Sequence, residues 1–394
     1  MPPDRVRAAL AGASRPVCAY VYDREVLRTR AAALKAALPA GAELLYAVKA
    51  NGHPDVVATL AAATDGLEVA SGGELALARA AGARRIAFGG PAKPEASLMA
   101  ALSAGAMIHA ESALELHRLA FMIRASLKSL ERREGRPDHG EVGVALRVNR
   151  RDGGLPGSHQ MAGAPTPFGI DEADLPGVVA LARTLPHIRV IGFHLHAVSN
   201  NLDGARHAAF VDDALRWSVA TAASLGIALE YVNVGGGFGV DYTGPATFDT
   251  APLAAIVPPD GVRLVFEPGR WLAADAGWYA AEVLDLKRTH GRWFAVLRGG
   301  THHFRLPAAW GYSHPFTVLP VDDWPHPYPR PAVEDVDVDA VGELCTPRDV
   351  LTRGQRVERL RVGDVLVFGR AGAYGWDISH HEFLRHPPPQ MFVV

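Results

Sequence analysis

The chain of 394 residues has few cysteines, little net charge and no hydrophobic run long enough to span a bilayer. Its two cysteines, Cys18 and Cys345, provide no disulfide framework and favour a reducing compartment. A formal net charge of -2 gives no general attraction to nucleic acid or to an anionic membrane. The N-terminal segment also lacks the apolar core of a signal peptide. The composition therefore predicts a soluble cytoplasmic protein that binds neither nucleic acid nor membranes.

Short apolar runs alternate with Ala- and Leu-rich segments of helical period over the first part of the chain. Each run is expected to be a strand; in order they are ELLYAVKA, GLEVA, RIAFGG, AMIHA, VGVALRVN, VIGFHLHA, YVNVGGG and RLVFEPG. This number of strand–helix units within roughly 250 residues is typical of a (β/α)8 TIM barrel. The periodicity indicates a parallel sheet but does not distinguish a closed barrel from an open one.

The sequence after Arg270 changes to strand-like runs separated by Gly, Pro and Asp. We therefore expect a barrel over residues 24–270, and a β-sandwich or β-barrel domain formed by residues 1–23 together with 271–394. The Pro- and aromatic-rich segment 310–335 is expected to be a long functional loop.

Lys49 lies at the end of an apolar run, where an unpaired lysine is rarely buried. The run alone fits a lysine that reaches out to solvent as well as it fits a nucleophilic amine. The C-terminal ends of barrel strands carry the chemistry of this architecture, so the position itself favours a functional role.

The glycine-rich segment VNVGGGFG follows a predicted strand and contains Gly235, Gly236 and Gly237. Consecutive glycines allow backbone amides to approach a phosphate closely, although a plain tight turn has the same pattern. A dinucleotide site would place such glycines in the first βαβ unit, and a triphosphate loop requires Gly-Lys-Ser/Thr. Neither condition is met.

Glu267 ends the next apolar run, and Gly269 and Arg270 follow it. The carboxylate fits an ordinary salt bridge with Arg270 or a contact with a protonated ring nitrogen. In GFHLHAVS, the spacing of His194 and His196 is compatible with a metal site. No third ligand with suitable spacing accompanies them, so stacking of His196 on a flat cofactor is favoured and no metal is expected.

Taken together, these segments resemble the fold-type III pyridoxal-phosphate decarboxylases, which include diaminopimelate and ornithine decarboxylases and share their barrel with alanine racemase. The resemblance lies in ordered motifs that extend from about residue 17 to the end of the chain: YAVKAN, SGGEL, FGGPAK, PFGI, HLHAVS, GGGFG, EPGR, CTPRD and GAYG. It implies a pyridoxal 5'-phosphate (PLP)-dependent carboxy-lyase. The carboxylate of Glu267 argues against alanine racemase, which places an arginine near the ring nitrogen.

The resemblance implies specific roles for residues of this chain. Lys49 would bond the cofactor through its amine, His196 would stack on the ring, and Glu267 would keep the ring nitrogen protonated. The phosphate would be held by Ser199, Gly235, Gly236, Gly237, Gly269, Arg270 and Tyr374. Either Cys345 or Lys49 would return a proton to the α-carbon. The family's shared active sites imply a homodimer in which Cys345 and Asp349 complete the site of the partner subunit.

The residues around Cys345 bear on the substrate. Diaminopimelate decarboxylases have Glu, and ornithine decarboxylases Asp, directly after this cysteine, whereas this chain has Thr346, with Arg348 two positions later. An arginine suits planar carboxylates, so a substrate with an acidic distal end is expected. Asp349 completes the proposed substrate-binding turn.

Three segments resemble the subgroup that acts on citrate–amino acid conjugates in carboxylate-siderophore biosynthesis: SNNLD, RGGTHHFRLPAAWGYSHPF and GAYGWDISHHEFL. A representative reaction is citryl-diaminopropionate to citryl-ethylenediamine, in which His302, His303 and Arg305 would meet the citryl carboxylates. The segment that contains His302 and His303 also fits a dimer interface that packs on Trp310 and Phe316. Two other functions stay open: decarboxylation of diaminopimelate, lysine or ornithine, and PLP binding without turnover.

Overall fold

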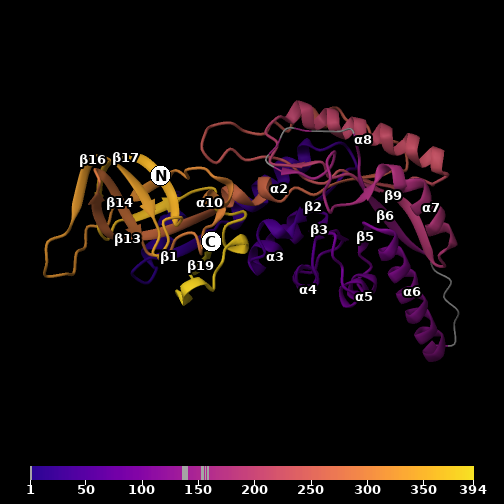
Figure 1. The fold of residues 1–394 in the computed structure, drawn as a ribbon, viewed down its shortest axis with the longest axis horizontal. Helices are drawn as coiled ribbons and strands as arrows, with labels where there is room; N and C mark the ends of the chain where they lie inside the picture. Colours follow the sequence, from indigo (N-terminus) through magenta and orange to yellow (C-terminus); the bar gives the residue numbers. More distant parts are fainter. Residues whose placement is uncertain (1, 135–140, 152–154, 156, 158) are drawn as a thin grey trace. The chain divides into compact units, whose positions relative to one another are not determined.

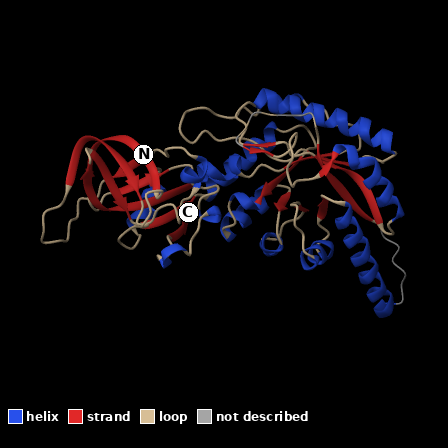
Figure 2. Cartoon of the chain, viewed as in Figure 1, coloured by secondary structure: helices blue, strands red, loops and turns tan. Residues whose placement is uncertain are grey.

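The computed structural model describes residues 2–134, 141–151, 155, 157 and 159–394, which form two compact units. The barrel unit consists of Thr29–Val240 and Ala246–Gly269, and the β unit consists of Met1–Arg28, Asp241–Pro245 and Arg270–Val394. Helices surround the strands of the barrel unit, whereas strands make up most of the β unit (Figure 2). Among the described residues, no helix is both long and apolar enough to cross a membrane.

Eight parallel strands form the barrel. Seven lie within the predicted runs, and β9 overlaps its run but begins two residues earlier. They are β2 (Glu43–Ala47), β3 (Gly66–Val69), β4 (Ile86–Phe88), β5 (Met107–Ala110), β6 (Val142–Asn149), β9 (Ile188–His194), β11 (Tyr231–Asn233) and β12 (Arg263–Phe266). Their order is β5-β4-β3-β2-β12-β11-β9-β6, and the pairing of β5 with β6 closes the ring. The predicted barrel fold is therefore confirmed. The pairing of β5 with β6 shows that the barrel is closed, which the periodicity of the sequence could not decide.

Helices cover the outside of the barrel strands, as α6, α7 and α8 show in Figure 1. The helices of this unit are α3 (Pro54–Ala63), α4 (Gly72–Ala80), α5 (Glu95–Ser103), α6 (Ala113–Glu134), α7 (Leu175–Thr184) and α8 (Gly204–Leu225). Side-chain caps start several of them; for example, Ser71 accepts a hydrogen bond from the Glu74 N–H, and Asp203 accepts one from the Arg206 N–H. Gly226, at φ 62°, ends α8 in a left-handed conformation.

Apolar side chains fill the interior of the barrel. One core cluster contains buried residues contributed by different strands: Leu45, Ala87, Ala145, Ile191, Tyr231 and Val265. Because the interior is packed, polar chemistry is confined to the ends of the strands.

The β unit is built on a sheet in the order β15-β18-β13-β14-β16-β17, with β1 pairing β13 and β19. The bounds are β1 (Cys18–Tyr22), β13 (Gly277–Thr289), β14 (Arg292–Leu297), β15 (Phe316–Leu319), β16 (Ala332–Val341), β17 (Val350–Arg361), β18 (Val365–Phe368) and β19 (Gln390–Val393). The short helices are α1 (Asp4–Ala11), α9 (Arg270–Ala273) and α10 (Leu306–Trp310), and α2 (Arg24–Ala37) links the two units in the chain. The predicted β-rich second domain is confirmed.

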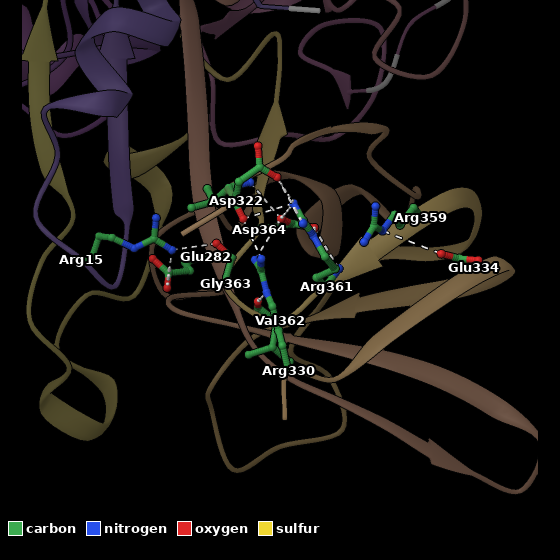
Figure 3. Close-up of polar contacts among 11 residues, drawn as sticks. Arg15, Glu282, Asp322, Arg330, Glu334, Arg359, Arg361, Val362, Gly363 and Asp364 are labelled. Carbon is green, nitrogen blue, oxygen red and sulfur yellow. Dashed lines mark hydrogen bonds and ion pairs between the residues drawn. The ribbon is translucent and has the colours of Figure 1, made fainter. Parts of the chain in front are cut away.

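The predicted loop 310–335 is only partly a loop. Strand β15 lies within it and pairs antiparallel with β18, and β16 begins at Ala332. The proline-rich remainder is tied to the sheet by arginines: Nη2 of Arg330 and Nη2 of Arg361 lie 3.2 and 3.0 Å from Oδ1 of Asp364 (Figure 3). The backbone N–H of Val321 donates to the same oxygen at 2.9 Å. One buried carboxylate therefore anchors both ends of this segment.

His207 on α8 packs next to the glycine-rich turn. It is 1% exposed and packs edge-on against the rings of Phe238 and Phe248, with ring centroids 4.7 and 5.5 Å apart. Neither ring nitrogen has a hydrogen-bond partner within the described part of the chain. Burial accordingly lowers the pKa of His207 from 6.5 to about 3.

This buried histidine predicts acid sensitivity. As the pH falls below about 6.5, the unfolded chain protonates His207 while the folded chain does not, so the stability contributed by the neutral ring is lost toward pH 3. His207→Phe removes this proton uptake. Between pH 7.5 and pH 5, urea unfolding of the variant is expected to lose about 1–2 kcal/mol less stability than wild type. The exposed-site variant His117→Gln is the control, and an unchanged pH slope in His207→Phe would contradict the prediction.

Candidate active site

Lys49 lies at the mouth of the barrel. Strand β2 ends at Ala47, and Lys49 is the middle residue of the 3-10 turn Val48–Ala50 that follows. Its side chain is 46% exposed, and its ammonium forms an ion pair with Glu68 at the end of β3. The lysine is therefore both accessible and held by a carboxylate.

Glu68 is a residue that the sequence reasoning missed. Burial raises the pKa of its carboxyl group, and the nearby charges of Lys49 and Arg147 offset part of that effect. The sequence did carry a signal, because Glu68 interrupts the apolar run GLEVA in the same way that Lys49 interrupts its own run.

The glycine-rich turn approaches His196 closely. The Gly236 N–H donates to Nδ1 of His196 at 3.2 Å, so the ring proton of a neutral His196 resides on Nε2. A Cβ on Gly235, whose φ is 69°, would lie 2.2 Å from the same Nδ1. Burial, together with the charge of Arg147, lowers the pKa of His196 well below 6.5. The turn requires glycine here, and the histidine beside it is neutral.

Ser199 and Gly269 complete the predicted set in the barrel unit. Ser199 belongs to the short strand β10 (Val198–Ser199), and a Cβ on Gly237 would come within 2.7 Å of the Val198 carbonyl oxygen. A Cβ on Gly269 would lie 2.8 Å from Cβ of Ala50, so glycine brings the end of β12 against the Lys49 turn.

Glu267 is 6% exposed and is held by Asn233, the last residue of β11. Nδ2 of Asn233 donates to Oε1 of Glu267 at 2.6 Å, and Oδ1 of Asn233 accepts from the Gly235 N–H at 2.8 Å. One amide therefore ties the carboxylate to the first glycine of the turn. Asn233 was not among the predicted site residues, although it directly precedes Val-Gly-Gly-Gly.

Two buried histidines face Glu267. Nε2 of His194 lies 3.4 Å from Oε2, and Nδ1 of His109 lies 4.0 Å from Oε1. Burial is the main cause that lowers the pKa of both rings well below 6.5, so both are neutral. Ligand atoms of these three residues lie within 4.8 Å of one another. The search for a third metal ligand by sequence spacing overlooked His109, because it lies on a different strand, β5.

In the β unit, Arg270 is the first residue of α9 and is 5% exposed. Its guanidinium carbon lies 4.5 Å from the ring centroid of Tyr374, a residue in the left-handed region at φ 53°. Arg270 forms no ion pair with a carboxylate among the residues described.

The turn after β16 presents Cys345 and Arg348 to solvent and buries Asp349. Oδ1 of Asp349 accepts from the Thr301 N–H at 2.6 Å and from Oγ1 of Thr301 at 2.8 Å, and Oδ2 accepts from the Leu344 N–H at 2.9 Å. The carboxylate of Asp349 thus binds its own turn to the 299–301 loop.

The remaining predicted substrate residues differ in exposure. His302 and His303 are both 0% exposed, and Nδ1 of His303 lies 3.3 Å from Sγ of the buried Cys18. Burial lowers the pKa of His303 to about 2. Arg305 is exposed, and its backbone N–H donates to Oγ of Ser379 at 3.0 Å.

Each unit offers groups that fit PLP. In the barrel unit, a buried carboxylate faces two imidazoles, and His194 has no hydrogen-bond partner on either ring nitrogen among the described residues. A glycine cradle stands beside His196, where any Cβ would clash. In the β unit, a buried guanidinium without a carboxylate partner suits a phosphate. Within the barrel unit, the carboxylate suits a protonated ring nitrogen and the neutral His196 suits a ring face.

Comparisons with known proteins identify the family. The family described as "Pyridoxal-dependent decarboxylase, pyridoxal binding domain" matches residues 24–274. The 2-[(L-alanin-3-ylcarbamoyl)methyl]-2-hydroxybutanedioate decarboxylase of Staphylococcus aureus is 39% identical over 391 residues, which cover 97% of this chain and 95% of that protein. The L-glutamyl-[BtrI acyl-carrier protein] decarboxylase of Niallia circulans is 31% identical, covering 94% of this chain and 87% of that protein.

A solved structure shares the fold. Diaminopimelate decarboxylase from Helicobacter pylori, complexed with L-lysine, superimposes with a TM-score of 0.82 and 22% identity, covering 99% of this chain and 94% of that one. The family match extends over the whole barrel unit, and the two sequence relatives match nearly the whole chain. The chain therefore belongs to the pyridoxal-dependent decarboxylases and is an enzyme that uses PLP as its cofactor.

Proposed function

We propose that this enzyme decarboxylates an amino acid whose distal end is joined to citrate, as in the conversion of citryl-diaminopropionate to citryl-ethylenediamine during carboxylate-siderophore biosynthesis. The observation that carries the proposal is the 39% identity, over 97% of this chain, to the Staphylococcus aureus enzyme. The name of that enzyme describes carbon 3 of L-alanine joined through a carbamoylmethyl group to 2-hydroxybutanedioate. This is an α-amino acid with distal carboxylates.

Bound PLP supplies an electron sink for the electron pair left when the carboxylate departs as carbon dioxide. We assign the bond to the cofactor to Lys49, the ring nitrogen to Glu267 and the ring face to His196. The residues assigned to the phosphate are Ser199, Gly235, Gly236, Gly237, Gly269, Arg270 and Tyr374.

The protein's own groups control protons at this site. The raised pKa of Glu68 makes its carboxylate a better acceptor for the proton of the Lys49 ammonium, and a neutral amine is the nucleophilic form. The neutral state of His194 leaves the negative charge of Glu267 uncompensated by an imidazolium, so that charge remains to stabilise a protonated ring nitrogen. Nζ of Lys49 and Sγ of Cys345 are the two groups assigned to reprotonation of the α-carbon.

The predicted substrate-binding residues fall into two groups, exposed and buried. Arg305 and Arg348 are exposed, whereas the rings of His302 and His303 are inaccessible. Direct contact with the distal carboxylates is therefore assigned to the two arginines. The two histidines lie beneath the protein surface and are not assigned a direct contact. Arginine also presents the planar fork that a carboxylate fits.

We further propose a cytoplasmic homodimer in which Cys345 enters the active site of the partner subunit. Two observations support this part of the proposal: Cys345 is exposed on a turn, and neither cysteine forms a disulfide.

Substrate identity is tested by carbon dioxide release from a panel of amino acids at equal concentration. The amide of citrate with L-2,3-diaminopropionate is expected to react at least 100-fold faster, by kcat/KM, than diaminopimelate, lysine or ornithine. Arg348→Ala and Arg305→Ala are expected to raise KM for the conjugate. Faster turnover of diaminopimelate would contradict the proposed substrate, and binding of PLP without any turnover would contradict the proposed reaction.

The role of Lys49 is tested by borohydride treatment of the PLP-loaded enzyme followed by peptide mass spectrometry. A pyridoxyl group is expected on Lys49, because its amine is accessible and has a carboxylate to take its proton. Lys49→Ala is expected to lose both the label and carbon dioxide release. Lys287→Ala changes another exposed lysine and should retain both. Labelling at a different lysine in the wild type would refute the assignment.

Asp349 is expected to position Cys345 rather than to touch the substrate, since its carboxylate already accepts three hydrogen bonds. Asp349→Ala leaves buried donors unpaired, which costs about 3 kcal/mol of folding stability and loosens the turn. We expect the alkylation rate of Cys345 to change and kcat to fall, with borohydride labelling of Lys49 intact. The exposed-site variant Asp337→Ala should match wild type. Unchanged Cys345 alkylation in Asp349→Ala would argue against a positioning role.

A further inference from the structure

Arg270 differs from the other buried arginines in the charge that surrounds it. Arg147 pairs with Glu111 at 3.0 Å, and Arg150 pairs with Asp213 at 2.9 Å. Arg270 is 5% exposed, yet its one hydrogen-bond acceptor among the described residues is neutral, the hydroxyl of Tyr242 at 3.0 Å from Nη1. Burying a charge without an anionic partner is costly, so the surroundings of this guanidinium must compensate.

Aromatic rings of the β unit provide that compensation. The guanidinium carbon of Arg270 lies 3.9 Å from the ring centroid of Trp310, 4.5 Å from that of Tyr374 and 5.7 Å from that of Tyr242. The rings also contact one another, with Trp310 6.0 Å from Tyr374 and 6.1 Å from Tyr242. A cation–π contact is stronger when it is desolvated, as it is here. The three rings, called here the aromatic box, stabilise the charge without neutralising it.

Further contacts hold the box in place. Tyr242 stacks on Tyr312 at 5.5 Å, the Tyr312 hydroxyl lies 3.1 Å from Nδ1 of His314, and Nε2 of His314 lies 2.7 Å from the Gly369 carbonyl oxygen. Because Nε2 of His314 must donate to that carbonyl, Nδ1 of the neutral ring accepts from the Tyr312 hydroxyl. These contacts, through Tyr312 and His314, anchor Tyr242 to the end of β18.

Trp310 is fixed by its position in the backbone. It is the last residue of α10, and Gly311, at φ 70°, ends that helix immediately after it. The indole is therefore carried by an ordered helix end and not by an extended loop.

We propose that Trp310 and Tyr242 are positioning residues that hold the guanidinium of Arg270 in the orientation that receives the cofactor phosphate, and so favour PLP over pyridoxal. The inference rests on the proposed role of Arg270 as a phosphate ligand. A guanidinium binds phosphate through parallel N–H groups, which makes affinity depend on its plane. A side chain that is ordered before binding also loses less entropy on binding.

The test compares dissociation constants of PLP and of pyridoxal for the cofactor-free enzyme, measured by equilibrium dialysis. Trp310→Leu keeps an apolar side chain but removes the ring. It is expected to weaken PLP binding about tenfold and to change pyridoxal binding less than twofold. Tyr242→Phe removes the acceptor for Nη1 and is expected to weaken PLP binding about threefold. Trp310→Phe retains a ring and should stay within threefold of wild type, which keeps the test informative if the leucine variant fails to fold.

Trp324→Leu is the matched control, because Trp324 lies 5.4 Å from the guanidinium of Arg330 in the same unit, and Arg330 has a carboxylate partner. This variant should bind both ligands as wild type does. Equal weakening of PLP and pyridoxal by Trp310→Leu, or an unchanged ratio, would overturn the positioning role. Arg270→Lys separates the two claims: an unchanged ratio in that variant would overturn the phosphate assignment of Arg270 itself.

Discussion

The hydrogen bond between Asn233 and Glu267 is the contact on which the barrel site depends. A single buried amide donates to the carboxylate at 2.6 Å and accepts from the Gly235 backbone at 2.8 Å, while its Nδ2 also donates to the Tyr231 hydroxyl at 2.9 Å. Displacing this amide would release the carboxylate and the glycine turn together. The groups assigned to the ring nitrogen and to the phosphate of the cofactor are therefore positioned by the same side chain.

Burial determines the charge pattern around that contact. The histidines nearest Glu267 are neutral because the packed interior penalises an imidazolium more than one carboxylate can compensate. Burial acts on Glu68 in the opposite direction: it raises the pKa of this carboxyl group and so favours the protonated form, while the charge of Lys49 lowers the pKa. The barrel thus places neutral histidines beside Glu267, and it pairs a second buried carboxylate, Glu68, with the ammonium of Lys49.

The sequence predicted elements that depend on local pattern and missed those that depend on distant pairing. All eight barrel strands were identified because each is a short apolar run bounded by polar or glycine residues. Strand β15 was not, since prolines flank its four residues and only pairing with β18 defines it. His109 meets Glu267 across 158 positions of the chain, a separation over which spacing rules carry no information. Asp349 was predicted to bind substrate from its place in CTPRD, but the donors that occupy its carboxylate could not be deduced from that motif.

Substrate choice must arise outside the features that define the fold. The Helicobacter pylori structure superimposes at a TM-score of 0.82 and is named for diaminopimelate, whereas the Staphylococcus aureus relative is named for a citrate-derived conjugate. A shared barrel therefore does not decide the substrate, and side chains on turns do. In this chain, the buried carboxylate of Asp349 ties the turn that carries Cys345 to the 299–301 loop, while Arg348 remains exposed on the same turn. Under the proposed assignment of Arg348, the residue that recognises the distal carboxylates can therefore change without moving Cys345.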